Sequence, residues 1–245
     1  MTAMLASVRT TEEALLALAG GADIIDLKDP ARGALGALAE ATSRQILAAL
    51  GGRIPVSATI GDFPSMIPAE LLAAAERTAD TGVDFVKAGF FPSPRQAKCA
   101  RALLPLARRV PMVAVLFADC APDLDLMDTL AACGFAGVML DTADKRAGSL
   151  LRHLDLAHLA AFVGRARARR LFSGLAGSLK LADVSLLLPL DADYLGFRGA
   201  LCCGDRSSAL DPDALARVRA AMPRTQGSTS SPAGAPPVSR RARYA

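Results

Sequence analysis

The sequence predicts a single (β/α)8 TIM barrel over residues 1–222, an α/β fold in which eight parallel strands alternate with eight helices. Short apolar runs alternate with helical patterns eight times along the chain, as a parallel sheet covered by helices requires. A glycine also ends a helix and opens an apolar run at Gly21, Gly82 and Gly134, with separations of 61 and 52 residues, about two strand–helix units each. An open doubly wound sheet is the alternative, but no G-x-G-x-x-G sequence opens a helix.

The expected strands are short, and most are apolar on both faces. In chain order they are Met4–Ser7, Ile24–Leu27, Pro55–Thr59, Phe85–Ala88, Pro111–Phe117, Gly137–Leu140, Leu171–Ser173 and Tyr194–Phe197. The expected helices are Thr11–Ala19, Ser43–Leu50, Pro68–Thr81, Arg95–Leu106, Leu124–Cys133, Asp155–Arg169, Leu181–Leu188 and Asp211–Ala221.

Two of the expected helices begin with residues that commonly cap helix N-termini. Thr10 or Thr11 followed by Glu13, and Asp211 followed by Pro212, are typical of helix N-termini.

Residues 223–245 are rich in Pro, Ser and Arg with almost no large apolar side chain. Such a segment cannot bury enough surface to offset its ordering entropy, so a disordered tail is expected.

The composition argues against a nucleic acid or a membrane as partner. The formal net charge is only +4, much of the basic charge lies at one helix end and in the tail, and the chain has two Tyr and no Trp for base stacking. The apolar runs are too short to span a bilayer, and the N-terminus does not resemble a signal peptide.

The cysteines and histidines predict neither disulfides nor a metal site. Five cysteines occur without C-x-x-C spacing, and the only two histidines, His153 and His158, are five residues apart. Reduced thiols and a cytoplasmic location are therefore expected, with no metal ligand set.

The lysines are the most informative residues. Of 28 Lys and Arg residues only five are lysines, which leaves 23 arginines. A position that needs a neutral amine, for a Schiff base or for proton transfer, cannot be given to Arg. Lys28, Lys87 and Lys145 lie at or just beyond the ends of apolar strand-like runs, which indicates amine chemistry.

In a barrel of this kind, the C-terminal ends of the strands meet at one mouth. The strand assignment then brings together Asp26, Lys28, Lys87, Asp141 and Lys145 as the candidate catalytic residues. Amines gathered in one pocket lower each other's pKa, and two carboxylates can keep one lysine charged while another is neutral. Plain Lys–Asp ion pairs remain the simpler alternative for any single pair.

Two segments after the seventh and eighth strands predict an anion site. Ser173–Lys180 contains Gly174, Gly177 and Ser178, and the second segment contains Arg198 and Gly199. Glycines allow backbone N–H groups to approach a phosphate, and these two loops are its usual place in the fold. Whether Lys180 or Arg198 contacts the phosphate is left open. The pattern alone indicates a barrel enzyme that handles a small phosphorylated carbonyl compound through a lysine.

The chain resembles the (5-formylfuran-3-yl)methyl phosphate synthase family, also called 4-(hydroxymethyl)-2-furancarboxaldehyde-phosphate synthase, of methanofuran biosynthesis. The resemblance rests on the segments GGADIIDLKDP from Gly20, DFVK from Asp84, LDT from Leu140 with Lys145, GLAGSLK from Gly174, and RGA from Arg198. It covers about residues 4 to 220.

The resemblance implies that the protein condenses two glyceraldehyde 3-phosphate molecules, with loss of phosphate and water and without metal or organic cofactor. It also implies that Lys28 forms the Schiff base, that Lys87 accepts a proton, and that Asp26, Asp141 and Lys145 belong to the active site. Two alternatives stay open: another Schiff-base aldolase of triose phosphates, and a barrel that only binds a phosphorylated ligand. The order of phosphate elimination and carbon–carbon bond formation, the role of the tail and the formation of a homo-oligomer are also open.

Overall fold

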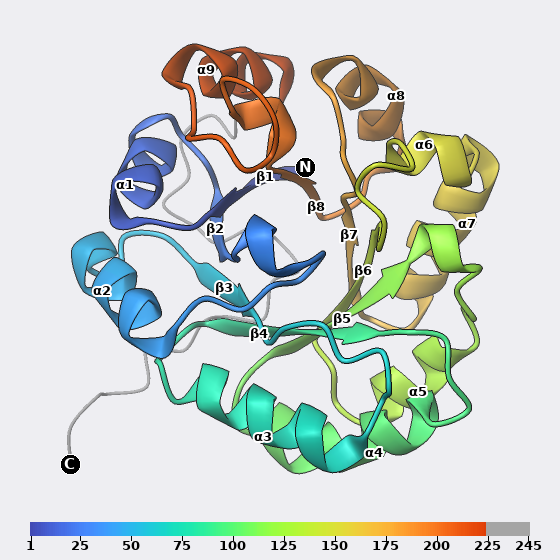
Figure 1. Ribbon diagram of the computed structural model, residues 1–245. Helices are drawn as coiled ribbons and strands as arrows, with labels where there is room; N and C mark the ends of the chain where they lie inside the picture. The colour runs from blue at the N-terminus through green and yellow to red at the C-terminus, as the bar shows by residue number, and fades with distance from the viewer. Residues whose placement is uncertain (224–245) are drawn as a thin grey trace.

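The computed structural model describes residues 1–223, which form a closed barrel of eight parallel strands in the order of the sequence (Figure 1). The predicted fold is therefore confirmed. The strands are β1 (Ala3–Val8), β2 (Ile24–Leu27), β3 (Val56–Thr59), β4 (Phe85–Phe90), β5 (Met112–Phe117), β6 (Gly137–Asp141), β7 (Phe172–Leu175) and β8 (Tyr194–Phe197). The barrel closes where β8 pairs with β1, with Ala3 opposite Tyr194. Apart from Pro223, the tail predicted for 223–245 lies outside the described residues.

Helices surround the barrel and follow the predicted pattern with two differences. They are α1 (Thr11–Ala19), α2 (Glu40–Leu50), α3 (Pro68–Ala79), α4 (Gln96–Ala107), α5 (Leu126–Ala132), α6 (Leu150–His153), α7 (Leu156–Ala168), α8 (Val184–Leu187) and α9 (Pro212–Ala221). The single-turn helix α6 was not predicted. The helix expected over Leu181–Leu188 is instead the short α8 between two 3-10 turns, Leu181–Asp183 and Leu188–Leu190.

Side-chain caps fix where several helices begin. Thr10 Oγ1 accepts a hydrogen bond from the Glu13 backbone N–H, and Glu13 Oε2 accepts one from the Arg9 N–H, close to the predicted capping box. Asp211 Oδ1 accepts from the first N–H groups of α9, whose first residue is Pro212.

Alternation along the strands separates two apolar regions. Outward side chains such as Ile25, Leu27 and Val86 pack under the helices in the main core. A smaller cluster fills the barrel interior; its buried members are Leu5, Ala34, Leu35, Val113, Val115, Phe117, Met139, Ala176 and Tyr194. Nearer the C-terminal ends of the strands the barrel interior is polar instead, with Asp26, Lys87 and Asp141 among its buried side chains.

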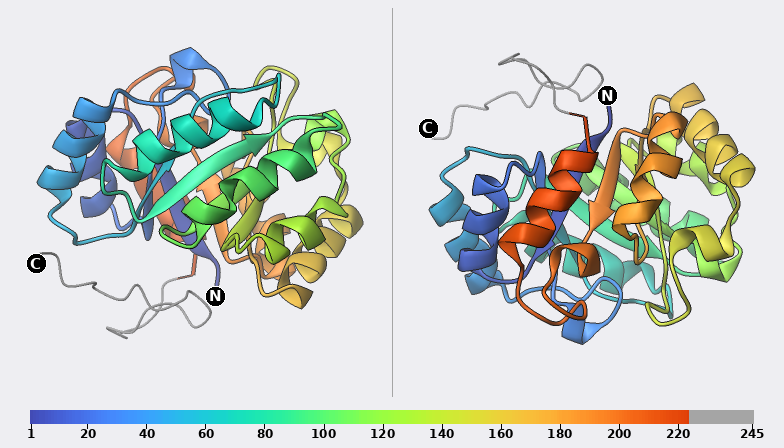
Figure 2. Two further views of the ribbon diagram at one scale, coloured as in Figure 1. Left: turned by 90° about the horizontal axis from the view of Figure 1, so that it is seen from below. Right: turned by 90° about the horizontal axis from the view of Figure 1, so that it is seen from above.

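The loops after β2 and β8 lie close together at the end of the barrel opposite Met1, as both views of Figure 2 show. This end is the mouth formed by the C-terminal ends of the strands. The loop after β2 carries the 3-10 turn η1 (Pro30–Arg32), and the loop after β8 carries η5 (Gly199–Leu201). A hydrogen bond from Arg206 to the Gly33 carbonyl joins the two loops directly.

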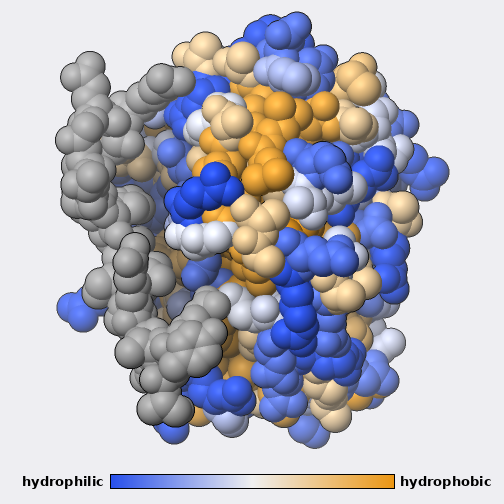
Figure 3. Space-filling model, turned by 90° about the vertical axis from the view of Figure 1, so that its left-hand side faces the viewer, coloured by the Kyte–Doolittle hydropathy of each residue, from blue (hydrophilic) through white to orange (hydrophobic). Residues whose placement is uncertain are grey.

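The outer surface mixes hydrophilic and apolar side chains. Figure 3 looks onto the side that carries α1 and α2, where apolar side chains gather in the upper part of the view. Leu15 of α1 is one of the large apolar residues that remain exposed. Among residues 1–223, no helix is both long and apolar enough to cross a membrane.

Candidate active site

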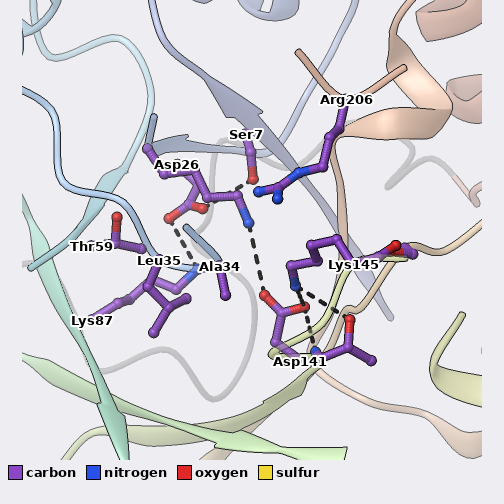
Figure 4. A network of polar contacts seen from close by, with 12 residues as sticks. Ser7, Asp26, Ala34, Leu35, Thr59, Lys87, Asp141, Lys145 and Arg206 are labelled. Atoms are coloured by element: carbon purple, nitrogen blue, oxygen red, sulfur yellow. Dashed lines mark hydrogen bonds and ion pairs between the residues drawn. The ribbon is translucent and has the colours of Figure 1, made fainter. Parts of the chain in front are cut away.

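A cavity of about 740 Å³ opens at the mouth of the barrel. Its wall contains all five predicted catalytic residues, which come from three strands or the residues just after them: Asp26, Lys28, Lys87, Asp141 and Lys145. Figure 4 shows the Asp26–Lys87 pair and the Asp141–Lys145 pair on opposite sides of this space. The structure thus brings the predicted residues together in one site.

Asp26 and Lys87 form an ion pair inside the barrel. Lys87 Nζ donates to Asp26 Oδ1 at 2.9 Å, and the hydroxyls of Ser57 and Ser7 donate to the two carboxylate oxygens at 2.7 and 3.0 Å. Asp26 is 0% exposed and Lys87 2%. All of these side chains point inward because they occupy alternate positions of neighbouring strands.

Burial acts differently on the two partners. Burial alone would raise the pKa of Asp26, but the ammonium groups of Lys87 and Lys28 and the Ser57 hydroxyl outweigh it, so the pKa of Asp26 is lowered. For Lys87 burial is the largest influence and lowers the pKa, against the opposing charge of Asp26. Lys87 is therefore an amine that gives up its proton more easily than a lysine in water.

Asp141 lies between two amines. Its Oδ1 accepts hydrogen bonds from Lys145 Nζ and from the Thr142 N–H, and its Oδ2 lies 3.8 Å from Lys28 Nζ. Burial alone would raise the pKa of Asp141, but Lys145 and Lys28 bring it down to about 2. Burial lowers the pKa of Lys145 to about 8, because the nearby charge of Lys28 adds to it and Asp141 only partly compensates.

Lys28 is the amine with the loosest contact. Asp141 is the only carboxylate within 4.0 Å of its Nζ in the described part of the chain. The side chain is buried, yet it lines the cavity, so an incoming carbonyl carbon can reach the nitrogen. A buried amine that lies near a carboxylate without a hydrogen bond to it is suited to nucleophilic attack on an aldehyde.

The loop after β2 is pinned over the Lys87 side of the site. Asp62 accepts hydrogen bonds from the N–H groups of Ala34 and Leu35 at 2.9 and 3.0 Å. Gly33 has a φ of +116°, and a side chain there would collide with the Asp62 carboxylate. Leu35 is 1% exposed, and Figure 4 shows it beside Lys87. The pinned loop thus places a buried apolar side chain next to Lys87, in keeping with the low exposure of that lysine.

A second carboxylate braces the loop that carries Lys145. Asp119, after β5, accepts hydrogen bonds from the N–H groups of Ala143 and Asp144, both at 2.8 Å. Ser178 in turn donates to the Lys145 carbonyl at 3.2 Å. Lys145 is therefore held from two neighbouring loops.

The predicted anion-binding residues divide into two groups. Gly177, Ser178 and Gly199 line the cavity, and Gly177 and Ser178 have φ values of +112° and +48°. Gly174 does not line it: this residue lies within β7, and the ring of Tyr194 occupies the space that a side chain would need, 2.3 Å from an ideal Cβ. The structure thus gives Gly174 a packing role.

Arg198 lines the cavity, but its guanidinium is fully occupied by protein groups. It donates to both carboxylate oxygens of Glu13 and to the carbonyls of Ser7, Arg206 and Ser208. The side chain is only 5% exposed. Contact with a phosphate would require one of these bonds to break. Lys180 also lines the cavity and is exposed.

Sequence reasoning missed three polar groups of this site, namely Ser7, Ser57 and Arg206. The two serines occupy inward positions of β1 and β3 beside Asp26, a placement that strand alternation could have indicated. Arg206 lies in an irregular loop, where the sequence contains no periodic signal. Within residues 1–223, no group of three or more His, Cys, Asp or Glu side chains is arranged to hold a metal ion.

The chain is similar in sequence to known proteins over most of its length. The family model described as 4-HFC-P synthase matches residues 4–219. The chain is 46% identical over 220 residues to a Methylorubrum extorquens protein provisionally named (5-formylfuran-3-yl)methyl phosphate synthase, covering 89% of this chain and 91% of that protein. It is 34% identical over 227 residues to the (5-formylfuran-3-yl)methyl phosphate synthase of Methanosarcina mazei, covering 88% and 97%.

Solved structures with the same fold are more distant in sequence. Phosphoribosyl anthranilate isomerase from Thermus thermophilus matches with a TM-score of 0.63 at 18% identity, over 90% of this chain and 98% of that one. A 3-hexulose-6-phosphate synthase matches with a TM-score of 0.61 at 20% identity, over 90% and 100%. At this identity the likeness concerns the barrel fold alone.

Proposed function

Because the chain belongs to the 4-HFC-P synthase family, we propose that it is the enzyme that condenses two glyceraldehyde 3-phosphate molecules into (5-formylfuran-3-yl)methyl phosphate, with loss of phosphate and water. In this proposal it serves methanofuran biosynthesis. The observation that carries the proposal is the arrangement of three amines, two buried and one half-buried, around two buried carboxylates in one cavity. Burying ion pairs is a poor way to stabilise a protein, so a chemical role accounts for them better than stability does.

Lys28 is the proposed nucleophile. Its Nζ faces the cavity and lies 3.8 Å from Asp141, a distance that stabilises positive charge at Lys28 without a direct hydrogen bond that would block attack. Condensation with the aldehyde carbon releases water and gives an imine. The protonated imine withdraws electrons from the adjacent carbon, which makes the proton on that carbon easier to remove.

Lys87 is the proposed proton acceptor. Burial lowers the pKa of its ammonium group, so at neutral pH the neutral amine is more accessible here than in water. Asp26 balances the charge once Lys87 has taken the proton, since the two groups are 2.9 Å apart. Ser7 and Ser57 hold the Asp26 carboxylate in place by donating to both of its oxygens.

Lys145 is the proposed proton donor on the opposite side of the cavity. With a pKa of about 8, its ammonium group is mostly protonated at pH 7 and can donate to a leaving or developing oxygen. The Asp26–Lys87 and Asp141–Lys145 pairs would then perform base and acid steps separately. Elimination of phosphate, bond formation with the second triose and dehydrating ring closure complete the reaction.

The charge of the cavity suits phosphorylated substrates. Eight basic and three acidic side chains line it, and one of the basic residues, Arg198, is neutralised by Glu13. Gly177, Ser178 and Gly199 belong to the loops where this fold usually binds phosphate.

Product analysis tests the proposed reaction. The purified enzyme is incubated with glyceraldehyde 3-phosphate alone, and ultraviolet absorbance, inorganic phosphate and product mass are followed together. The proposal predicts a furan aldehyde phosphate and one inorganic phosphate for each furan formed. An ordinary aldolase product without a furan chromophore would contradict it, as would binding without turnover. In a single turnover, phosphate release only after the carbon–carbon bond has formed would reverse the order of steps given above.

A further inference from the structure

Arg206 projects into the active-site cavity from the loop after β8. The side chain is half-buried and lines the cavity wall, and Figure 4 shows its guanidinium end beside Ser7, above the space between the Asp26–Lys87 and Asp141–Lys145 pairs. Its Nη2 donates to the Gly33 carbonyl at 3.1 Å. Within residues 1–223 this is the one hydrogen bond of its guanidinium, so most of its donors remain available.

The loop that carries Arg206 is firmly held. Arg198 donates to the Arg206 carbonyl at 2.8 Å and to the Ser208 carbonyl at 2.7 Å, while Glu13 neutralises Arg198. Asp205 accepts from the Ser207 N–H at 2.8 Å. An isolated antiparallel β-bridge, formed by backbone hydrogen bonding between Cys202 and Leu210, closes the base of the loop. The backbone that carries Arg206 is therefore held in place by the protein's own contacts, and the hydrogen bond to Gly33 directs its guanidinium.

The electrostatic setting of Arg206 is unfavourable without an anion. No carboxylate of the described chain lies within ion-pair distance of its guanidinium. The positive charge of Arg206 contributes to the lowered pKa of Lys145. Burial lowers the pKa of Arg206, and Asp141 only partly compensates. A guanidinium that is half-desolvated, close to an amine and largely unpaired fits a site that receives a strongly charged anion.

We propose that Arg206 binds the phosphate group of the triose held at Lys28, and that Arg198 and Glu13 position it for that task. The proposal rests on the function proposed above and names a specificity-determining residue for it. A guanidinium can bind two phosphate oxygens at once, whereas a lysine offers a single point charge. Because Arg206 also donates to the Gly33 carbonyl, a phosphate bound to Arg206 would lie near the loop after β2.

The test compares a substrate with and without its phosphate. Borohydride trapping on Lys28 is measured with glyceraldehyde 3-phosphate and with glyceraldehyde, for the parent protein and for Arg206→Ala and Arg206→Lys. Arg32→Ala is the matched control, because Arg32 is an exposed arginine of the neighbouring loop that does not line the cavity. Thermal unfolding of each variant shows whether the fold is kept.

Arg206→Ala should lower the apparent affinity for glyceraldehyde 3-phosphate by about 10- to 100-fold, as expected for the loss of charge-assisted hydrogen bonds. Trapping of glyceraldehyde should stay within about twofold of the parent, because this substrate has no phosphate for Arg206 to bind. The affinity of Arg206→Lys for glyceraldehyde 3-phosphate should lie between those of the parent and of Arg206→Ala, and the affinity of Arg32→Ala should match that of the parent. Inorganic phosphite, added with glyceraldehyde, should speed trapping in the parent and not in Arg206→Ala.

Two results would overturn the inference. An equal loss for both substrates in Arg206→Ala would mean that Arg206 supports the chemistry or the loop instead of the phosphate. An unchanged preference for the phosphorylated substrate would mean that the phosphate binds elsewhere. Failure of the parent protein to form any adduct or furan would instead overturn the function proposed for the whole site, so the two failures are distinguishable.

Discussion

Asp26 accepts a hydrogen bond from Lys87 at 2.9 Å in the interior of the barrel, where the two side chains are almost completely buried. Two hydroxyls complete the coordination of the carboxylate, so the charges are paired and hydrogen-bonded, as burial demands. Both side chains also line the cavity, and the Asp26 carboxylate accepts three hydrogen bonds from protein groups. In the proposed mechanism, that geometry allows Lys87 to exchange a proton with substrate while Asp26 stays ionised.

Replacement of Asp26 should destabilise the protein strongly. Asp26→Asn leaves the buried Lys87 ammonium without its counter-charge, which should lower the free energy of unfolding by about 3–5 kcal/mol. The double variant Asp26→Asn/Lys87→Met removes the unpaired charge and should recover part of that loss while remaining inactive. Urea unfolding of the two single variants and the double variant measures the coupling. Additive effects of the two substitutions would contradict the pairing.

Lys28→Arg should fold normally and lose activity. Arginine preserves the positive charge near Asp141 but cannot form an imine, so furan formation should fall below about one thousandth of the parent rate. Initial rates from furan absorbance provide the measurement, and the melting temperature provides the control for folding. Substantial turnover by this variant would rule out Lys28 as the nucleophile.

The reaction rate should fall at alkaline pH because of Lys145. The pKa of this residue is lowered to about 8, so its protonated, proton-donating form is lost as the pH rises through that value. The expected pH profile of kcat/KM therefore has a falling limb centred near pH 8. Lys145→Arg stays protonated throughout and should remove that limb from whatever activity remains. Persistence of the same limb in the variant would assign it to another group.

The same residue should make the protein more stable as the pH rises from about 8 toward 10.5. In this window the unfolded chain keeps the Lys145 proton, with its usual pKa of 10.5, while the folded chain has largely lost it. Stability rises with pH wherever the unfolded state binds more protons. Comparison of urea unfolding at pH 8 and pH 10 for the parent and for Lys145→Met tests this. The increase in the free energy of unfolding between pH 8 and pH 10 should be smaller in the variant than in the parent. The same increase in both proteins would show that Lys145 is not responsible.

Gly174→Ala should destabilise the barrel through packing. An added Cβ would meet the Tyr194 ring at 2.3 Å, and overpacking of this kind costs about 1–3 kcal/mol. Gly164→Ala in α7 is the matched control, because no atom lies within 4 Å of its added Cβ. Thermal unfolding should show a lower melting temperature for the first variant only. Equal melting temperatures would mean that the ring moves aside without cost.

The barrel could be predicted because its signals are local and repeated. β2, β8 and α1 have the predicted bounds, since turn glycines, a threonine cap and apolar runs mark them directly. α6 escaped because a helix of four residues is too short to show a period. The helix expected over Leu181–Leu188 is broken up, with 3-10 turns on both sides of α8 and Pro189 within the second.

The site could be predicted where its residues follow strands, and only in part elsewhere. Lys28, Lys87 and Asp141 lie in or directly after strands, so the topology alone brings them to one mouth. The engagement of Arg198 by Glu13 spans 185 residues of sequence, and the packing of Gly174 against Tyr194 depends on strand register. Contacts of this kind have no local signal. They explain why the sequence did not indicate that Glu13 pairs with Arg198 or that Gly174 packs against Tyr194.

Identification of the lysine that traps the substrate tests the central claim most directly. The protein is mixed with glyceraldehyde 3-phosphate, reduced with borohydride, and digested for peptide mass mapping, with Lys28→Arg as the control. The account predicts one stable adduct on the peptide that contains Lys28, and none in the control. An adduct on Lys87 or Lys145, or the absence of an adduct while triose phosphate demonstrably binds, would contradict it.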